Sequence, residues 1–131
     1  MSKSIDVVRS IYRAFAAGDL PAVLGHLDPE IQWNEAEGFP YSDGNPYVGP
    51  EAVVAGVFAR LSKDWDGFRV EVGEIVGGDE VVTMLGRYKG RAKKSGRPLD
   101  VQAMHTWWLR TGKAVRFQQM VDTAGVAANL G

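Results

Sequence analysis

Apolar and polar residues alternate with a period of two along residues 66–91 and again along residues 99–123. Alternation of this kind is typical of β-strands that bury one face. Polar or glycine-rich stretches at residues 77–79, 92–98 and 111–112 interrupt the alternation, as expected between the strands of antiparallel hairpins. The second half of the chain therefore predicts a run of four antiparallel strands.

The first half of the chain is mostly helical in its spacing. Apolar residues recur at helical intervals along residues 4–17, and a second, shorter helix is expected over residues 20–27. Residues 31–35 alternate and predict one strand, whereas residues 50–61 predict a third helix that begins at a proline. Each helix has one apolar stripe to bury, which favours helices packed on one face of a strongly curved antiparallel sheet. Such a sheet and a long helix enclose a cone whose open end can admit a small molecule.

A loop is predicted over residues 36–50, where Gly and Pro are frequent. It carries the aromatic residues Phe39, Tyr41 and Tyr47. Loops of this length are often functional, but the aromatic side chains of a structural Ω-loop can also plug one end of a core. Both interpretations stay open.

The composition is that of a globular protein. A chain of 131 residues with 45% hydrophobic content can build one core, and we expect a single domain over residues 1–131. The formal net charge of -1 provides no basic stripe for a phosphate backbone, so nucleic acid is not an expected partner. No stretch approaches the roughly 18 apolar residues of a membrane span, and the first residues contain no apolar leader segment. We therefore expect no membrane partner and a cytoplasmic location.

The sequence lacks the motifs that hold metals and nucleotides. It has no cysteine, and its two histidines, His26 and His105, are not at ligand-like spacing. Glycine-rich nucleotide-binding motifs and the nucleophile elbow of hydrolases do not occur. We expect neither a metal nor a cofactor.

The candidate chemistry begins in the hairpin over residues 99–123. Alternation puts His105 and Trp107 on one face of the first strand, and Phe117 and Gln119 in one row of the second. We expect His105 and Gln119 to share the concave face, where an apolar environment shifts pKa values. In the alternative interpretation, His105 is a core histidine whose ring nitrogens are satisfied by neighbours.

Glu35 is the candidate base. It lies at the end of the first predicted strand beside Trp33, and burial there would raise its pKa toward the range of a useful general base. The alternative is an exposed charge at a strand end, because Glu is rarely buried unpaired. Glu37 is close enough in sequence to take the same role.

The two adjacent tryptophans of the hairpin, Trp107 and Trp108, must face opposite sides of the sheet. One of them therefore lies on the outer face, where a large apolar side chain is costly to leave in water. We predict a homodimer through this outer face, with Trp108 and Met104 in the interface.

Four segments carry a family resemblance: AAGDL at residues 16–20, IQWNEAEGFPY at 31–41, VGPEAVV at 48–54 and LRTGKAVRFQQMVDT at 109–123. Together they resemble the SnoaL-like branch of the superfamily that shares the nuclear transport factor 2 and ketosteroid isomerase fold. The resemblance implies an α+β, cystatin-like cone, with N-terminal helices packed on a strongly curved, mostly antiparallel β-sheet. One fold of this kind hosts many functions, including some that are not enzymatic.

The resemblance also implies roles for single residues. The carboxylate base of steroid isomerases falls at Glu35, and their proton-donating acid falls at His105. Their helix-one tyrosine falls at Ile11, with Tyr12 one residue away, so one donor of a true steroid isomerase is out of place. The polyketide cyclase members are more similar, with a histidine at the position of His105 and an acid on the following strand. Here that acid is Asp122, which alternation puts on the row opposite Gln119 and which could instead cap the C-terminal segment.

The predicted function is small-molecule binding in a conical hydrophobic pocket, with acid–base residues suited to an isomerase or cyclase acting on a small apolar carbonyl compound. The alternative is a non-catalytic ligand-binding or protein-interaction module, and the sequence leaves open whether the protein is an enzyme. The expected catalytic residues are Glu35, His105 and Gln119. The residues expected to bind the ligand are Tyr12, Trp33, Tyr41, Phe58, Tyr88, Trp107, Phe117 and Asp122.

Overall fold

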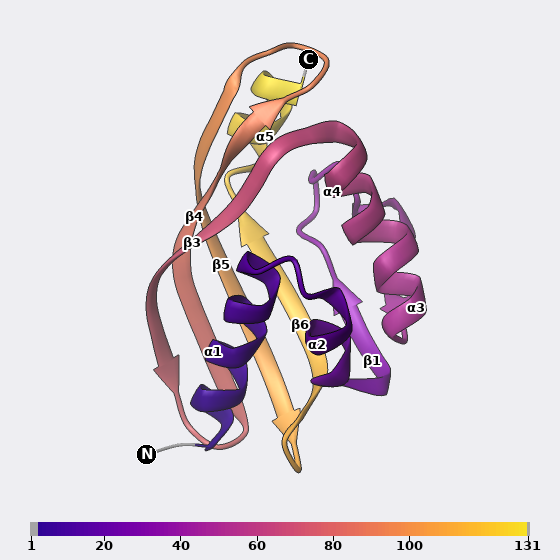
Figure 1. Ribbon diagram of the computed structural model, residues 1–131, viewed down its shortest axis with the longest axis vertical. Helices are drawn as coiled ribbons and strands as arrows, with labels where there is room; N and C mark the ends of the chain where they lie inside the picture. Colours follow the sequence, from indigo (N-terminus) through magenta and orange to yellow (C-terminus); the bar gives the residue numbers. More distant parts are fainter. Residues whose placement is uncertain (1–2, 131) are drawn as a thin grey trace.

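The computed structural model describes residues 3–130 and shows helices packed against one strongly bent sheet (Figure 1). The elements follow in the order α1 (Lys3–Ala16), α2 (Leu20–Gly25), β1 (Leu27–Asn34), η1 (Ser42–Gly44), β2 (Tyr47–Val48), α3 (Pro50–Val53), η2 (Val54–Phe58), α4 (Ala59–Asp64), β3 (Trp65–Gly77), β4 (Val81–Ala92), β5 (Pro98–Arg110), β6 (Lys113–Val121) and α5 (Thr123–Leu130). The six-stranded sheet of this described part has the order β2-β1-β6-β5-β4-β3. All neighbouring strands are antiparallel except β1 and β6, which are parallel.

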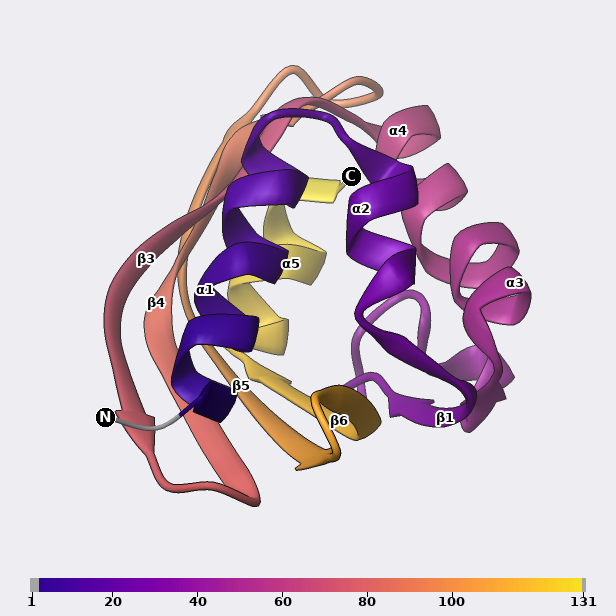
Figure 2. The same cartoon turned by 60° about the horizontal axis from the view of Figure 1, so that its bottom comes forward.

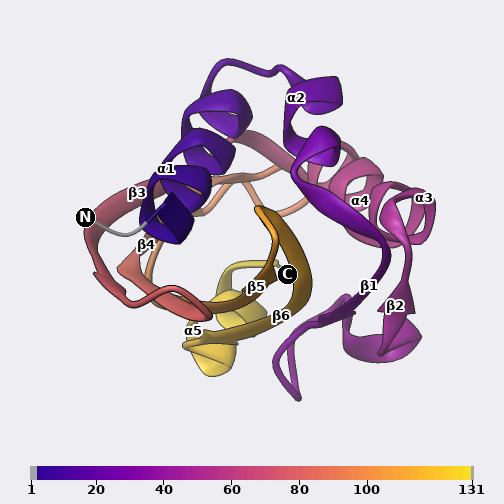
Figure 3. The same ribbon diagram turned by 90° about the horizontal axis from the view of Figure 1, so that it is seen from below.

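The sheet curves around the interior, and α1 and α2 cover its open side (Figures 2 and 3). Helix α1 buries Val8, Ile11 and Tyr12, whose spacing of three and four residues puts them on one helical face. Asp19 caps α2 by accepting a hydrogen bond from the backbone N–H of Ala22. The expected α+β cone is therefore the observed fold.

The central hairpin agrees with the alternation in the sequence. His105 pairs with Gln119 and Trp107 pairs with Phe117 across β5 and β6, and all four side chains are buried. The register shifts between Trp108 and Leu109, so that Ala114 is buried where strict alternation from Gln119 would bury Val115. The bulge lies beyond the paired polar residues and leaves their register intact.

Strand β1 is longer than expected and has a partner that the sequence does not reveal. It begins at Leu27, because α2 ends at Gly25 rather than at residue 27. It pairs parallel to β6, with Trp33 opposite Phe117 and Asn34 opposite Gln118. This pairing brings the residue after the strand, Glu35, next to Gln119.

The predicted loop over residues 36–50 contains a short 3₁₀ turn and the two-residue strand β2. The predicted third helix begins at Pro50 as expected and runs on as α3, the π-helical turn η2 and α4 to Asp64. The C-terminal segment is helix α5, and the carboxylate of Asp122 accepts a hydrogen bond from the backbone N–H of Gly125 in its first turn, at 3.0 Å. Asp122 is therefore the cap of α5.

The outer face of the sheet carries a row of apolar side chains at the centre of three strands. Leu85 pairs with Met104, and Met104 pairs with Met120, with Leu85 and Met120 exposed. Trp108 is on the same face but half-buried, and the guanidinium of Arg116 lies 4.2 Å from the centre of its ring. Within residues 3–130 no helix has the length and apolar character needed to cross a membrane.

Candidate functional site

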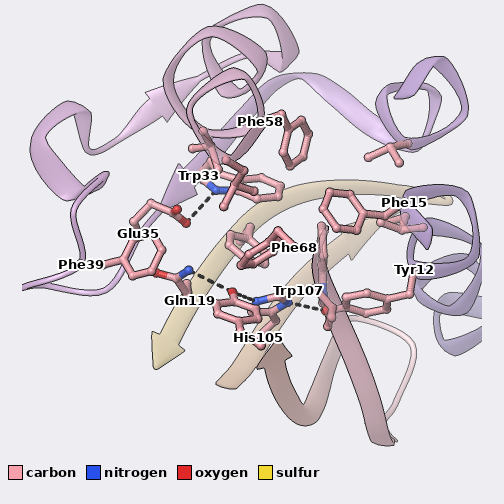
Figure 4. A pocket seen from close by; sticks show the side chains of 17 residues that line it. Tyr12, Phe15, Trp33, Glu35, Phe39, Phe58, Phe68, His105, Trp107 and Gln119 are labelled. Atoms are coloured by element: carbon pink, nitrogen blue, oxygen red, sulfur yellow. Dashed lines mark hydrogen bonds between the residues drawn. The ribbon is translucent and has the colours of Figure 1, made fainter. Parts of the chain in front are cut away.

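A cavity lies between the concave face of the sheet and the helices (Figure 4). The volume of the cavity is about 50 Å³, counted as the space that the centre of a water molecule can occupy. One water needs roughly 15 Å³ by the same measure. The walls are mainly aromatic and aliphatic, and the polar groups among them are the side chains of Tyr12, Glu35, Tyr88, His105, Gln119 and the two tryptophans. The complete lining is Ile11, Tyr12, Phe15, Val23, Trp33, Glu35, Phe39, Val57, Phe58, Leu61, Phe68, Val70, Tyr88, His105, Trp107, Phe117 and Gln119.

The carboxyl group of Glu35 is inside this cavity. The residue directly follows β1 and is 3% exposed. The indole N–H of Trp33 donates to its Oε2 at 3.1 Å, and the side-chain amide of Asn45 makes two hydrogen bonds to its backbone, at 2.9 and 2.7 Å. Burial raises the pKa of the Glu35 carboxyl to about 8, although the Trp33 hydrogen bond and the charge of Arg60 oppose that rise. Near neutral pH the group can therefore both accept and donate a proton.

His105 lies on β5, two strands away from Glu35, and is held between two tyrosines. Tyr12 Oη is 2.6 Å from its Nδ1, and Tyr88 Oη is hydrogen-bonded to its Nε2. Burial lowers the pKa of His105 to about 3, so the imidazole is neutral near pH 7. Both ring nitrogens have protein partners, so the ring is held in place and gives the cavity no positive charge.

The tyrosines extend the hydrogen bonds of His105 to Trp107 on the same strand and to Gln119 on β6. The indole N–H of Trp107 donates to Tyr12 Oη at 2.9 Å. The amide of Gln119 donates from Nε2 to Tyr88 Oη at 2.9 Å and accepts the backbone N–H of Ala36 at Oε1, at 3.0 Å. Burial raises the pKa of both tyrosines above the usual range, so both hydroxyls keep their protons near neutral pH. We call Trp107, Tyr12, His105, Tyr88 and Gln119 the polar chain of the cavity.

Three phenylalanines form the mouth of the cavity. Phe15, Phe58 and Phe68 line both the cavity and a groove of about 390 Å³ on the neighbouring surface. The ring centre of Phe15 is 5.8 Å from that of Phe58 and 6.5 Å from that of Phe68. All three rings are half-buried and lie where the cavity adjoins the groove, so we call these three phenylalanines the mouth of the cavity.

The structure brings most of the predicted site residues together. Glu35, His105 and Gln119 line one cavity, and so do Tyr12, Trp33, Phe58, Tyr88, Trp107 and Phe117. Their roles stay a prediction.

Two residues expected to bind the ligand lie elsewhere. The Tyr41 ring packs against Phe39 and the guanidinium of Arg60, and its hydroxyl donates to the backbone oxygen of Arg60 or to the carboxylate of Asp64, at 3.1 and 2.8 Å. Asp122 caps α5, since alternation along β6 turns it away from Gln119. Glu37, the competitor of Glu35, is exposed.

Besides five aliphatic side chains of the lining, sequence reasoning missed four residues at the site. Phe15 and Phe68 form part of the mouth, and Phe39 reaches the cavity wall from the loop. Asn45 fixes the backbone of Glu35. Phe15 and Phe68 are periodic apolar residues like any core residue. Phe39 and Asn45 lie in the Gly- and Pro-rich loop, where Asn is an ordinary turn residue and gives no signal of its own. In the described part of the chain, no three His, Asp or Glu side chains cluster as a metal site requires.

Comparison with known proteins identifies the family. Residues 8–117 match the model of the SnoaL-like domain. The chain belongs to the SnoaL-like family. No curated protein matches this SnoaL-like chain.

Solved structures agree with the family assignment. An NTF2-like protein from Burkholderia thailandensis E264 is 30% identical, with 100% of this chain and 99% of that chain covered and a TM-score of 0.93. An NTF2-like protein of unknown function from Burkholderia pseudomallei K96243 is also 30% identical, with 99% and 98% covered and a TM-score of 0.90. IdmH from Streptomyces antibioticus, provisionally described as a polyketide cyclase, is 18% identical, with 98% of both chains covered and a TM-score of 0.81. The likeness to IdmH is one of fold.

Proposed function

We propose that this SnoaL-like protein binds a small, neutral, mostly apolar carbonyl compound and moves a proton on the carbon next to the carbonyl group, as a cofactor-independent isomerase or cyclase. The observation that supports the proposal is the carboxyl of Glu35, which is buried in an aromatic cavity and has its pKa raised to about 8. A base with that pKa is matched to abstraction of a weakly acidic proton near neutral pH.

The lining of the cavity favours a neutral ligand. It contains no Lys or Arg, and His105 is neutral because burial lowers its pKa to about 3. A carboxylate or phosphate would be buried beside Glu35 without a compensating cation, at a high cost in desolvation. A ketone or ester needs only a hydrogen bond to its oxygen, and the polar chain runs along the cavity from Gln119, beside Glu35, to His105 and Tyr12 (Figure 4).

In the proposed step, the Glu35 carboxylate removes a proton from the α-carbon. The electron pair of the broken C–H bond forms the C=C bond of an enolate, and the charge moves to the carbonyl oxygen. Hydrogen-bond donors of the polar chain stabilise that oxygen. In an isomerisation, Glu35, now protonated, returns the proton to another carbon. In a cyclisation, the enolate carbon instead attacks a second carbonyl carbon, the C=O π electrons move to its oxygen, and the resulting alkoxide takes the proton from Glu35. The closed aromatic walls keep water away from the enolate.

The test does not require the natural substrate. Cyclohexanone is incubated with the protein in D₂O, and exchange of its α-protons is followed by NMR. We expect catalysed exchange whose rate rises with pH and levels above about pH 8, the pKa of Glu35. Glu35→Gln should reduce exchange to the rate in buffer, while Glu37→Gln, which changes an exposed carboxyl two residues along, should exchange like the wild type. Wild-type exchange no faster than buffer, or a fully active Glu35→Gln variant, would refute the proposal.

The alternative is a ligand-binding protein without turnover, and one observation favours it. Both nitrogens of His105 are already bonded to protein groups, so the imidazole is not free to act as a proton donor or acceptor toward a ligand. Under this alternative cyclohexanone would bind in the cavity, as detected by quenching of the Trp33 and Trp107 fluorescence, and its α-protons would exchange only at the buffer rate.

A further inference from the structure

Both ends of the polar chain are oriented by groups that can only donate. The indole N–H of Trp107 is a donor with no acceptor function, so Tyr12 Oη must accept at that end. The backbone N–H of Ala36 is likewise only a donor, which identifies the Gln119 atom that it meets as the amide oxygen. The amide nitrogen of Gln119 therefore faces Tyr88, and Tyr88 Oη accepts at this end.

The protons between these ends can then be counted. A neutral imidazole has one N–H and one bare nitrogen. One tyrosine must donate its only hydroxyl proton to the bare nitrogen of His105, and the other must accept from the ring N–H. The accepting tyrosine already accepts from Trp107 or Gln119, so both of its lone pairs are used while its own proton is not. Neither hydroxyl has another acceptor among residues 3–130. One buried hydroxyl proton on the cavity wall is therefore left for a ligand.

We propose that Tyr88 is the residue that carries this proton and donates it to the oxygen of the bound ligand, with His105 as a positioning residue in the Nε2–H form. The inference rests on the proposed function only for the ligand class, a neutral compound with a carbonyl oxygen. The sequence predicted that His105 contacts the ligand oxygen. In this proposal Tyr88 makes that contact, and His105 orients the Tyr88 hydroxyl.

Three observations favour Tyr88 over Tyr12. The negative charge of Glu35 contributes to the rise of the pKa of Tyr88 and is not among the causes of the rise for Tyr12, so Tyr88 is the hydroxyl that the carboxylate influences. A ligand that gives a proton to Glu35 must also reach the donor, and Gln119, the partner of Tyr88, is bonded to the residue after Glu35.

The third observation is the supply of donors at each end. Trp107 has a single N–H, which Tyr12 uses. The amide nitrogen of Gln119 has two, and only the one donated to Tyr88 has an acceptor in the described chain. The Tyr88 end can therefore offer a hydroxyl and an amide proton to one oxygen, which is the donor pair that stabilises an enolate.

The first test determines which ring nitrogen of His105 carries the proton. The protein is labelled with ¹⁵N-histidine and saturated with cyclohexanone, and the ring nitrogen shifts and long-range couplings of His105 are measured by NMR. His26, half-buried at the end of α2, provides an internal reference. We expect neutral His105 with its proton on Nε2. A proton on Nδ1 would make Tyr12 the donor and would overturn the assignment.

The second test reads the hydrogen bond to the ligand. The C=O stretching band of bound cyclohexanone is recorded by infrared spectroscopy for the wild type, Tyr88→Phe and Tyr12→Phe. We expect a shift to lower wavenumber, relative to the ketone in hexane, that Tyr12→Phe retains and Tyr88→Phe loses. Tyr88→Phe should also lower affinity for cyclohexanone about tenfold and leave affinity for methylcyclohexane, which has no acceptor, unchanged. A shift that persists in Tyr88→Phe, or no binding of the ketone by the wild type, would overturn the inference.

The two proposals fail in different ways. If the shift of the C=O band depends on Tyr88 but the α-protons do not exchange, the proposed reaction is refuted and Tyr88 remains the donor to the ligand. If α-proton exchange depends on Glu35 but Tyr88→Phe leaves the C=O band unchanged, the role of Tyr88 is refuted and the proposed reaction stands.

Discussion

Replacing Glu35 with Gln tests the electrostatics of the cavity without any ligand. The pKa of the Glu35 carboxyl rises from 4.5 to about 8 on folding. Between these values the folded protein holds a proton that the unfolded chain has released, so the free energy of unfolding falls as pH rises. Each pH unit in this interval changes it by about 1.4 kcal/mol, which gives a total on the order of 5 kcal/mol.

His105 acts in the opposite direction at lower pH. Its pKa falls from 6.5 to about 3 on folding, so between these values the unfolded chain binds the extra proton and stability rises with pH. The two effects oppose each other between pH 4.5 and 6.5. Above pH 6.5 the Glu35 effect stands alone, and up to pH 8 it lowers stability by about 2 kcal/mol.

The assay is urea unfolding followed by tryptophan fluorescence at pH 6.5 and pH 8.5, at constant ionic strength. We expect the wild type to lose about 2 kcal/mol between the two conditions and Glu35→Gln to lose almost none, because Gln keeps an oxygen for the Trp33 N–H but cannot ionise. Glu37→Gln should behave as the wild type does. If Glu35→Gln lost as much stability as the wild type over this range, Glu35 would not be the buried, protonated group described above.

The remaining predictions concern the cap, the mouth and the outer face. Asp122→Ala should lower the free energy of unfolding in urea by about 1 kcal/mol, because α5 loses its cap, and should leave cyclohexanone binding unchanged. Weakened binding would show that Asp122 contacts the ligand after all. Phe58→Ala should widen the mouth and strengthen binding of ring ketones larger than cyclohexanone, measured by fluorescence titration, at a stability cost of about 2 kcal/mol; unchanged size selectivity would show that entry lies elsewhere. The predicted homodimer should appear in sedimentation velocity at micromolar concentration, and Leu85→Lys, which puts a charge beside Met104 on the outer face, should convert it to a monomer. A monomeric wild type would contradict the dimer.

The sequence alone determined most of the elements and the inward row of the central hairpin. A period of two and a short turn suffice to make His105 and Gln119 neighbours, because side-chain direction in a strand depends only on local backbone geometry. Apolar spacing likewise predicts the buried face of α1. The same local logic put Asp122 on the opposite row and made its role as a cap one of the expected alternatives.

Tertiary structure decided how these pieces form a site. The parallel pairing of β1 with β6 brings Glu35 to Gln119, and the packing of α1 brings Tyr12 to His105. Neither contact has a local pattern, since each joins segments that are far apart in the chain and adjacent only after the sheet bends. Burial then raises the pKa of Glu35 to about 8 and lowers that of His105 to about 3. Those shifts depend on the water excluded by every wall of the cavity, a property that no single stretch of sequence contains.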